Sequence, residues 1–245
     1  MRNILFAVLI LIAQPLLAAD LSREQVIELL QHATFDQRAD LRRKDLRSVD
    51  LSGLDLRYAD LWGADLRHAN LSRANLAGQN LDLTVMRGID LSYANLEGAS
   101  IFGVTMIDAD LSYANLKRSR VMAILERAKL VGADLEGAFW GADMKNQSMG
   151  LMRATCNKAD FTGANLKNAD FNRVLLRFAK LKNANLQGTN LYRADLSGAN
   201  LSGADLSGAD LREAILDEAD FTGANLSGTK LDGAAGLESA RGLKR

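Results

Sequence analysis

The sequence predicts an all-β solenoid, in which short coils stack along one axis. A five-residue pattern continues from about residue 39 to residue 231: a small residue, Asp or Asn, Leu, and then two small or polar residues. So short and persistent a period is the signature of a repeat architecture. In addition, outward residues recur at a spacing of twenty. The only proline, Pro15, precedes the repeats, so every repeat residue can donate its backbone N–H to a neighbouring coil.

Leucines spaced by five cannot share one face of a helix or of an unbroken strand. On an α-helix each residue turns by about 100°, so these leucines would spread around the cylinder. On a strand an odd spacing sends successive leucines to opposite faces. We therefore expect a turn in every repeat, with the central Leu (position i) and the Ala at i−2 pointing inward. Positions i−1, i+1 and i+2 should point outward, and the chain should bend near i+2, where Gly198, Gly203 and Gly208 lie.

Identical outward residues twenty positions apart predict four repeats in each coil. Coils stacked at roughly 4.8 Å, the spacing of hydrogen-bonded strands, would form about nine or ten turns and a rod of about 45 Å. The residues that recur are Ser52, Ser72, Ser92 and Ser112, then Arg47, Arg67 and Arg87, and then Tyr93 and Tyr113.

The repeat resembles that of the pentapeptide repeat family, A(D/N)LxG. It is seen at residues 194–198 and again at residues 204–208, both of which read ADLSG. The resemblance covers nearly all of the chain after residue 38. It implies a right-handed quadrilateral β-helix, and both the handedness and the square section come from the resemblance.

We interpret residues 1–19 as a secretory signal peptide. Arg2 gives a positive start, residues 4–13 form an apolar core, and Leu17-Ala18-Ala19 precede Asp20 as a small-residue cleavage site. The apolar run is shorter than the roughly 20 residues of a spanning helix, so a retained membrane anchor is the less favoured alternative. We expect an exported protein, periplasmic or secreted, with no stable membrane span after cleavage.

Residues 20–38 are expected to form an N-terminal cap helix. Their apolar residues have helical spacing, and Ser22 with Gln25 three residues later forms a capping box. A solenoid needs such a cover, because an open end offers unpaired backbone groups to other chains. Residues 39–231 form the β-helix, and residues 232–245 lose the pattern and are expected to form a weak cap or to fray.

The repeat register slips in one region. It is unbroken over residues 41–121, whereas Leu125 comes one residue early and Met144 one residue earlier again. Leu151 restores the original phase after two extra residues. We therefore predict an irregular insertion, a bulge or small loop, near residues 145–150, and such loops on solenoids are often used in binding.

The sequence shows no catalytic or metal site. Asp and Asn are so numerous at i−1 that paired carboxylates such as Asp205 and Asp210 are unavoidable. Their expected role is to hydrogen-bond the adjacent turn backbone. The two histidines, His32 and His68, lack the spacing of metal ligands. We expect no enzymatic activity, no cofactor and no resident metal.

Cys156 is the only cysteine and is expected to be a small inward hydrophobe. Several methionines lie near it in the sequence, and soft sulfur ligands suit Cu(I), so a copper site is one hypothesis. The favoured alternative is that methionine fills gaps in an imperfect core. The methionines concerned are Met122, Met144, Met149 and Met152.

The candidate interaction surface consists of outward columns. One i+1 column stacks arginines, and a ladder of like charges indicates an anionic partner. The alternative, which we favour, is that each arginine pairs with a neighbouring Asp such as Asp45 or Asp65. A second i+1 column carries large apolar residues, which are enriched at protein interfaces. The residues of the candidate surface are Arg47, Arg67, Arg87, Trp62, Phe102, Tyr93 and Tyr113.

These features predict an exported, non-enzymatic interaction or scaffold rod with a protein partner, and they leave homodimerisation open. The formal net charge of zero and the pI near 6.8 do not favour nucleic acid as a partner. The alternative is a regulator or inhibitor of an enzyme that acts by surface mimicry. Gyrase-protecting members of the family resemble B-DNA through an acidic surface, which the neutral charge and the signal peptide of this chain disfavour.

Overall fold

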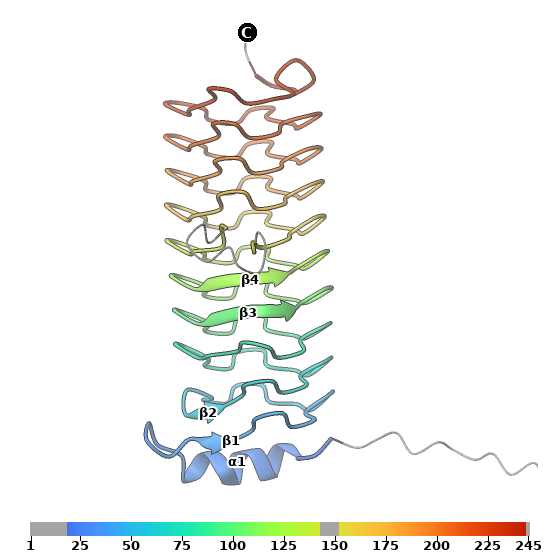
Figure 1. Ribbon diagram of the computed structural model, residues 1–245, viewed down its shortest axis with the longest axis vertical. Helices are drawn as coiled ribbons and strands as arrows, with labels where there is room; N and C mark the ends of the chain where they lie inside the picture. Colours follow the sequence, from blue (N-terminus) through green and yellow to red (C-terminus); the bar gives the residue numbers. More distant parts are fainter. Residues whose placement is uncertain (1–18, 143–151, 244–245) are drawn as a thin grey trace, which may run out of the picture.

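A computed structural model describes residues 19–142 and 152–243 as one tall stack of coils (Figure 1). The signal peptide predicted for residues 1–19 therefore lies, apart from Ala19, outside the described residues. The named elements are α1 (Arg23–Gln31), β1 (Ala39–Asp40), β2 (Ala59–Asp60), β3 (Ser100–Thr105) and β4 (Arg120–Ile124). In Figure 1, β3 and β4 run from left to right across the near face while the chain climbs away from α1. The coil is thus right-handed, and the predicted right-handed quadrilateral β-helix is confirmed.

Parallel pairing at a spacing of twenty joins successive coils. Asp45 pairs with Asp65, Asn95 with Asn115, and Asp205 with Asn225. The paired residue is the one at i−1 on each of the four sides. Hydrogen bonds run between the coils, for example from the backbone N of Leu206 to the carbonyl of Asn225 at 2.8 Å. Four repeats per coil, as expected from the recurring outward residues, are confirmed.

Most sides end in a tight turn at positions i+1 and i+2. In one such turn the backbone N of Ala64 donates to the carbonyl of Leu61 at 3.0 Å, and Gly63 at i+2 has a φ of 68°. A positive φ at the second central residue is a feature of the type II turn. The carboxylate of Asp60 at i−1 accepts the N–H of Trp62 at 3.2 Å. The predicted role of the i−1 residues in binding the turn backbone is confirmed.

The interior is filled by the residues at i and i−2. Leu206 and Ala204 are representative, with exposed fractions of 0% and 1%, and most repeats have the same pair, although polar residues such as Gln79 and Thr189 replace Ala at some i−2 positions. Phenylalanine replaces leucine at Phe161, Phe171 and Phe221, which are all buried. The predicted inward and outward positions are confirmed, and the core runs continuously along the rod.

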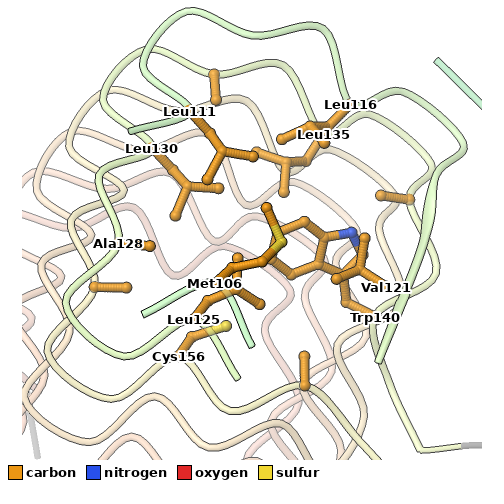
Figure 2. Packing of buried hydrophobic residues seen from close by; sticks show 14 of the residues in the cluster. Met106, Leu111, Leu116, Val121, Leu125, Ala128, Leu130, Leu135, Trp140 and Cys156 are labelled. Carbon is orange, nitrogen blue, oxygen red and sulfur yellow. The ribbon is translucent and has the colours of Figure 1, made fainter. Parts of the chain in front are cut away.

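Trp140 occupies an inward position just before the irregular region. Its ring stacks on Phe171, with centroids 5.4 Å apart, and meets the edge of Phe161 at 6.4 Å. The indole Nε1 donates to Ser119 Oγ at 3.2 Å, so the buried polar atom is satisfied. Figure 2 shows this ring pointing into the interior of the coil.

One repeat before Leu125 is a residue short, and the coil absorbs this deletion where β3 and β4 pair. Phe102 pairs with Met122, but the next pair joins Val104 to Ala123, so Gly103 has no partner residue. This is a β-bulge. The turn found at this corner in coils such as that of Leu61 is absent here, and both strands continue across it (Figure 1). Pairs above it, such as Asp110 with Lys129, are nineteen positions apart.

The predicted insertion near residues 145–150 falls within residues 143–151, outside the described residues. The pairs on either side measure its length. Ile124 pairs with Thr155, 31 positions later, where regular coils need twenty. This coil therefore holds eleven extra residues, and the expectation of two extra residues from the register was wrong.

The two ends of the rod are covered differently. At the N-terminal end, Val26 of α1 is buried against the first coil, and the predicted capping box between Ser22 and Gln25 is present. The guanidinium of Arg23 donates to the carbonyls of Asp50 and Ser52 at 2.8 and 2.9 Å, so the helix also satisfies the backbone edge of the first coil.

The C-terminal end is more open. The inward leucines of the last coil, Leu226 and Leu231, are only partly buried and line a hollow together with Leu237. Arg241 still pairs with Asp220, 21 positions earlier. Among the described residues, no helix is both long and apolar enough to cross a bilayer.

Candidate interaction surface

The arginine column lies at one corner of the rod and pairs with aspartates. Arg47 and Arg67 each contact the carboxylate two residues earlier, Asp45 and Asp65, at 2.5 Å. Arg47 also reaches Asp65 of the next coil at 3.7 Å. These contacts form a neutral ladder, which is the alternative that the sequence favoured. Arg87 differs, because Val85 occupies the position of the aspartate in its repeat.

The ion pairs affect the titration of the aspartates. Hydrogen bonds from the Arg47 side chain and then from the Arg47 backbone N–H lower the pKa of Asp45 to about 2. The side chain of Arg67 lowers the pKa of Asp65 in the same way. Both carboxylates are therefore ionised at neutral pH, and Arg47 and Arg67 are already neutralised within the chain.

Trp62 and Phe102 share a column at the neighbouring corner, but they lie two coils apart and do not form one apolar surface. Trp62 is partly buried, and the guanidinium of Arg43 lies 5.0 Å from the centroid of its ring. Asp82 lies between the two aromatic residues, where its carboxylate accepts the N–H of Phe102 and the hydroxyl of Ser100, both at 2.9 Å. Phe102 is 38% exposed.

Tyr93 and Tyr113 form an exposed stack at a third corner. Their ring centroids are 5.0 Å apart and their planes are nearly parallel, with an angle of 15°. The guanidinium of Arg73 covers the other side of Tyr93 at 4.9 Å. The stacking confirms that residues twenty apart form a vertical column.

The tyrosine stack ends on Gly132, which predicts a specific effect of substitution. A Cβ at Gly132 would lie 2.6 Å from the Tyr113 ring, and the φ of Gly132 is 63°. We expect Gly132→Ala to lower the free energy of unfolding by about 2 kcal/mol, since backbone strain and the ring contact add together. Urea unfolding followed by circular dichroism measures the loss.

Gly163 is the matched control for this prediction. It lies at the same corner one coil further on, has a φ of 66°, and has nothing within 4 Å of its Cβ position. Gly163→Ala should therefore cost only the backbone strain, about 1 kcal/mol. Equal losses for the two variants would contradict the close packing of Tyr113 on Gly132.

The seven residues of the candidate surface are thus spread over three corners. The Trp62 and Phe102 corner and the arginine corner flank one side of the rod, whereas the tyrosine stack lies diagonally opposite the Trp62 corner. Asp82 lies in the same column as Trp62 and Phe102, and Tyr93 lies two repeats further along the coil. Because each coil has four corners, a shift of two repeats leads to the opposite corner. No single face presents all seven residues to one partner.

The sequence analysis missed most of an exposed apolar cluster on β3, β4 and the coils beside them. Five of its members are between 38% and 53% exposed, and Met122 is partly exposed. The signal in the sequence was the presence of apolar residues at i−1, where the repeat has Asp or Asn. We call this cluster the β3–β4 patch, and it consists of Leu83, Val85, Phe102, Met122, Ile124 and Phe139.

The sulfur atoms give little support to the copper hypothesis. Cys156 is fully buried, and burial raises the pKa of its thiol. Met122 and Met152 are partly buried, whereas Met144 and Met149 lie outside the described residues. In the part of the chain that the structure describes, no three His, Cys, Asp or Glu side chains are grouped as metal ligands would be.

Comparison with known families finds a match to pentapeptide repeats. The family model matches in eight copies over residues 37–73, 69–106, 159–198, 169–208 and 199–234. The unmatched residues 107–158 include β4, the coil of nineteen residues and the insertion. A search of curated proteins found no match.

Solved structures of pentapeptide repeat proteins are similar to the chain. HetL from the cyanobacterium Nostoc sp. strain PCC 7120, a protein involved in the regulation of heterocyst differentiation, is 32% identical. That comparison covers 90% of this chain and 96% of HetL, with a TM-score of 0.41. A second Nostoc protein, alr5209, is 49% identical over 31% of this chain and 64% of its own, with a TM-score of 0.31. QnrB1, a plasmid-mediated fluoroquinolone resistance protein, is 24% identical over 78% of this chain and 92% of its own, with a TM-score of 0.35.

Proposed function

Because the chain belongs to the pentapeptide repeat family, we propose that it is a non-enzymatic scaffold that binds a protein partner through the outer surface of its β-helix. The observation that carries the proposal is the β3–β4 patch. Exposed apolar side chains gathered on successive coils, as Phe102, Ile124 and Phe139 are, are typical of interaction surfaces. A rigid stack whose backbone hydrogen bonds are made between its own coils holds such side chains at fixed positions.

Site-specific photocrosslinking in the cells that produce the protein tests this function. Benzoylphenylalanine would replace Phe102, Tyr113 or Phe178 in turn, which samples separate parts of the outer surface. A scaffold is expected to give a protein adduct, identified by mass spectrometry, from at least one of these positions. If no position yields a protein adduct, the scaffold function is contradicted.

We further propose that the scaffold acts outside the cytoplasm, in the periplasm or after secretion. The support is the sequence of residues 1–19, with its positive start, apolar core and small residues before Asp20. The purified protein is expected to begin at Asp20 in intact-mass spectrometry. A mature protein that retains Met1 would contradict export through this segment.

The open C-terminal end suits pairing with a second copy, which is the form of homodimer we propose. Leu226 and Leu231 are only partly buried there, and within residues 152–243 the backbone of this last coil pairs on one side only. Sedimentation velocity is expected to show a dimer that Leu231→Glu converts to a monomer. A monomeric natural protein would contradict this pairing.

A further inference from the structure

We infer that the β3–β4 patch is the docking site for a peptide segment that carries apolar side chains together with carboxylates. The inference rests on the proposed scaffold function and names the surface and the chemistry of the partner. It goes beyond the columns read from the sequence, because it moves the binding surface away from Trp62 and the paired arginines.

The patch lies where the rod is flattest. At most corners a turn separates one side from the next, but β3 and β4 continue straight across one corner. Their pairing holds Phe102 beside Met122 and Thr105 beside Ile124 in adjacent coils. Outward side chains along two neighbouring strands therefore share one surface, which an extended or helical segment can cover.

Three apolar residues of the patch occupy a position where the repeat usually has a hydrogen-bond acceptor. At i−1 the usual Asp or Asn accepts the N–H of residue i+1, as Asp60 does for Trp62. Val85, Ile124 and Phe139 cannot accept such a bond, yet they remain 39%, 43% and 53% exposed. They lose a hydrogen-bond acceptor without gaining full burial, so the fold alone does not account for them.

Leu83 adds a second departure. It occupies the turn position i+2 with a φ of 60°, a conformation that favours glycine. Its side chain is 49% exposed and lies over Gly103 of the next coil, where a Cβ would come within 3.2 Å of a Leu83 methyl group. This extends the patch from Phe102 down to the coil below.

Two arginines at the borders of the patch specify the charge of the partner. Arg87 follows Val85 at the next corner, and Arg120 begins β4 at a position where the repeat has Asp or Asn. Both are exposed, and neither forms an ion pair within residues 19–142 and 152–243. Arg127 and, to a smaller extent, the nearby charge of Arg87 lower the pKa of Asp108, but its Oδ1 forms an ion pair with Nε of Arg127 at 2.7 Å.

The acidic residues nearby do not neutralise these arginines. Asp82 directs its carboxylate to the N–H of Phe102 and the hydroxyl of Ser100. Glu126 lies past Ile124 at the following corner and is partly buried. A partner that places carboxylates against Arg87 and Arg120 and apolar side chains between them complements the patch in charge and polarity.

Panning a random dodecapeptide phage library on the purified protein tests the inference. The expected peptides combine at least two large apolar residues with an excess of Asp and Glu. A synthetic peptide of the enriched sequence should lose at least tenfold in affinity for the Phe102→Ser/Ile124→Ser variant. Because both side chains are outward, this variant should keep the circular dichroism spectrum and the melting temperature of the natural protein.

Ile215→Ser is the matched control. Ile215 lies at i−1 on the same side of the rod as Ile124 and has a similar exposed fraction, 39%. Its neighbours in the column are Asp195 and Ala235, so it stands outside the patch. This variant should bind the peptide with unchanged affinity.

Charge reversal tests the second part of the inference. Panning on the Arg87→Glu/Arg120→Glu variant should enrich peptides with Lys and Arg in place of Asp and Glu. Three results would each overturn the inference: no enrichment over an unrelated protein, peptides that bind the Phe102→Ser/Ile124→Ser variant equally well, or an unchanged charge preference after reversal. A dimer that this Phe102→Ser/Ile124→Ser variant splits would also overturn it, because the patch would then belong to a second copy.

The two experiments separate the inference from the proposed function. If crosslinking at Tyr113 or Phe178 gives protein adducts but panning gives no peptide that depends on the patch, the scaffold function is retained and the β3–β4 patch is not its binding site. If panning gives peptides that depend on the patch but no crosslinking position gives a protein adduct, the patch binds peptides and the cellular scaffold function is contradicted.

Discussion

Leu206→Asp is expected to lower the free energy of unfolding by more than about 4 kcal/mol. Leu206 is completely buried, and its neighbours in the column are Leu186, which is also buried, and Leu226, which is partly buried. Removing the side chain leaves a cavity, and the new carboxylate has no partner in the apolar interior. Thermal and urea unfolding by circular dichroism measure the loss.

Leu83→Asp is the matched control, since it makes the same chemical change at an outward Leu. The side chain is 49% exposed, and Asp tolerates the positive φ of this position better than Leu does. We expect a change within about 0.5 kcal/mol. A small effect at Leu206, or similar effects at the two positions, would show that Leu206 does not face the interior.

Trp140→Ala is expected to have the second largest effect, a loss of about 3–5 kcal/mol in the free energy of unfolding. The indole fills the coil next to the insertion, where it contacts Phe161 and Phe171. The substitution removes these contacts and also the partner of the Ser119 hydroxyl. Urea unfolding by far-ultraviolet circular dichroism is the appropriate measurement.

Trp140→Phe and Trp62→Ala separate the causes. Trp140→Phe keeps an aromatic ring but loses the hydrogen bond to Ser119, so a smaller loss of about 1–2 kcal/mol is expected. Trp62 is partly buried at a corner, and Trp62→Ala should cost about 1 kcal/mol. Equal losses for Trp140→Ala and Trp62→Ala would contradict the buried aromatic cluster.

The regular part of the fold could be predicted from the sequence because few backbone geometries satisfy a period of five. Leu206 and Ala204 had to be inward together, which required a turn in every repeat. The recurrence of Tyr93 and Tyr113 then set the coil length at twenty, and their stacking confirms it. The capping box at Ser22 was equally readable, because it depends on local sequence alone.

The irregular part could not be predicted, because a repeat register is known only in multiples of five. The expectation of two extra residues counted Met144 as an inward position, and a register in fives cannot distinguish an insertion of one residue from one of eleven, so the sequence did not reveal that Ile124 pairs with Thr155. The sequence did not reveal that β3 and β4 continue across one corner for a similar reason, because the register shows that a residue is missing but not how the backbone absorbs the loss. A missing residue can be absorbed by a bulge such as that at Gly103 or by a shortened turn.

The candidate surface was predicted in part. Residues twenty apart do lie in adjacent coils, as predicted. Spacing alone, however, does not show which charged side chains form ion pairs with each other. Arg47 and Arg67 pair with aspartates of the ladder, whereas Arg87 has Val85 in place of its aspartate. The spacing had placed Phe102 and Met122 in one column, but it did not show that β4 continues past them to Ile124, which extends the exposed patch.

Dipolar electron paramagnetic resonance on paired spin labels tests the square coil most directly. Ser92 and Ser112, twenty residues apart, lie in adjacent coils of one column, where the backbone N of Tyr93 donates to the carbonyl of Ser112 at 2.9 Å. Ser92 and Phe102 are only ten residues apart but lie at opposite corners. Cysteines introduced at these outward positions carry the labels, while Cys156 is buried. The account predicts a shorter distance for the pair at 92 and 112 than for the pair at 92 and 102, and the reverse order would contradict it.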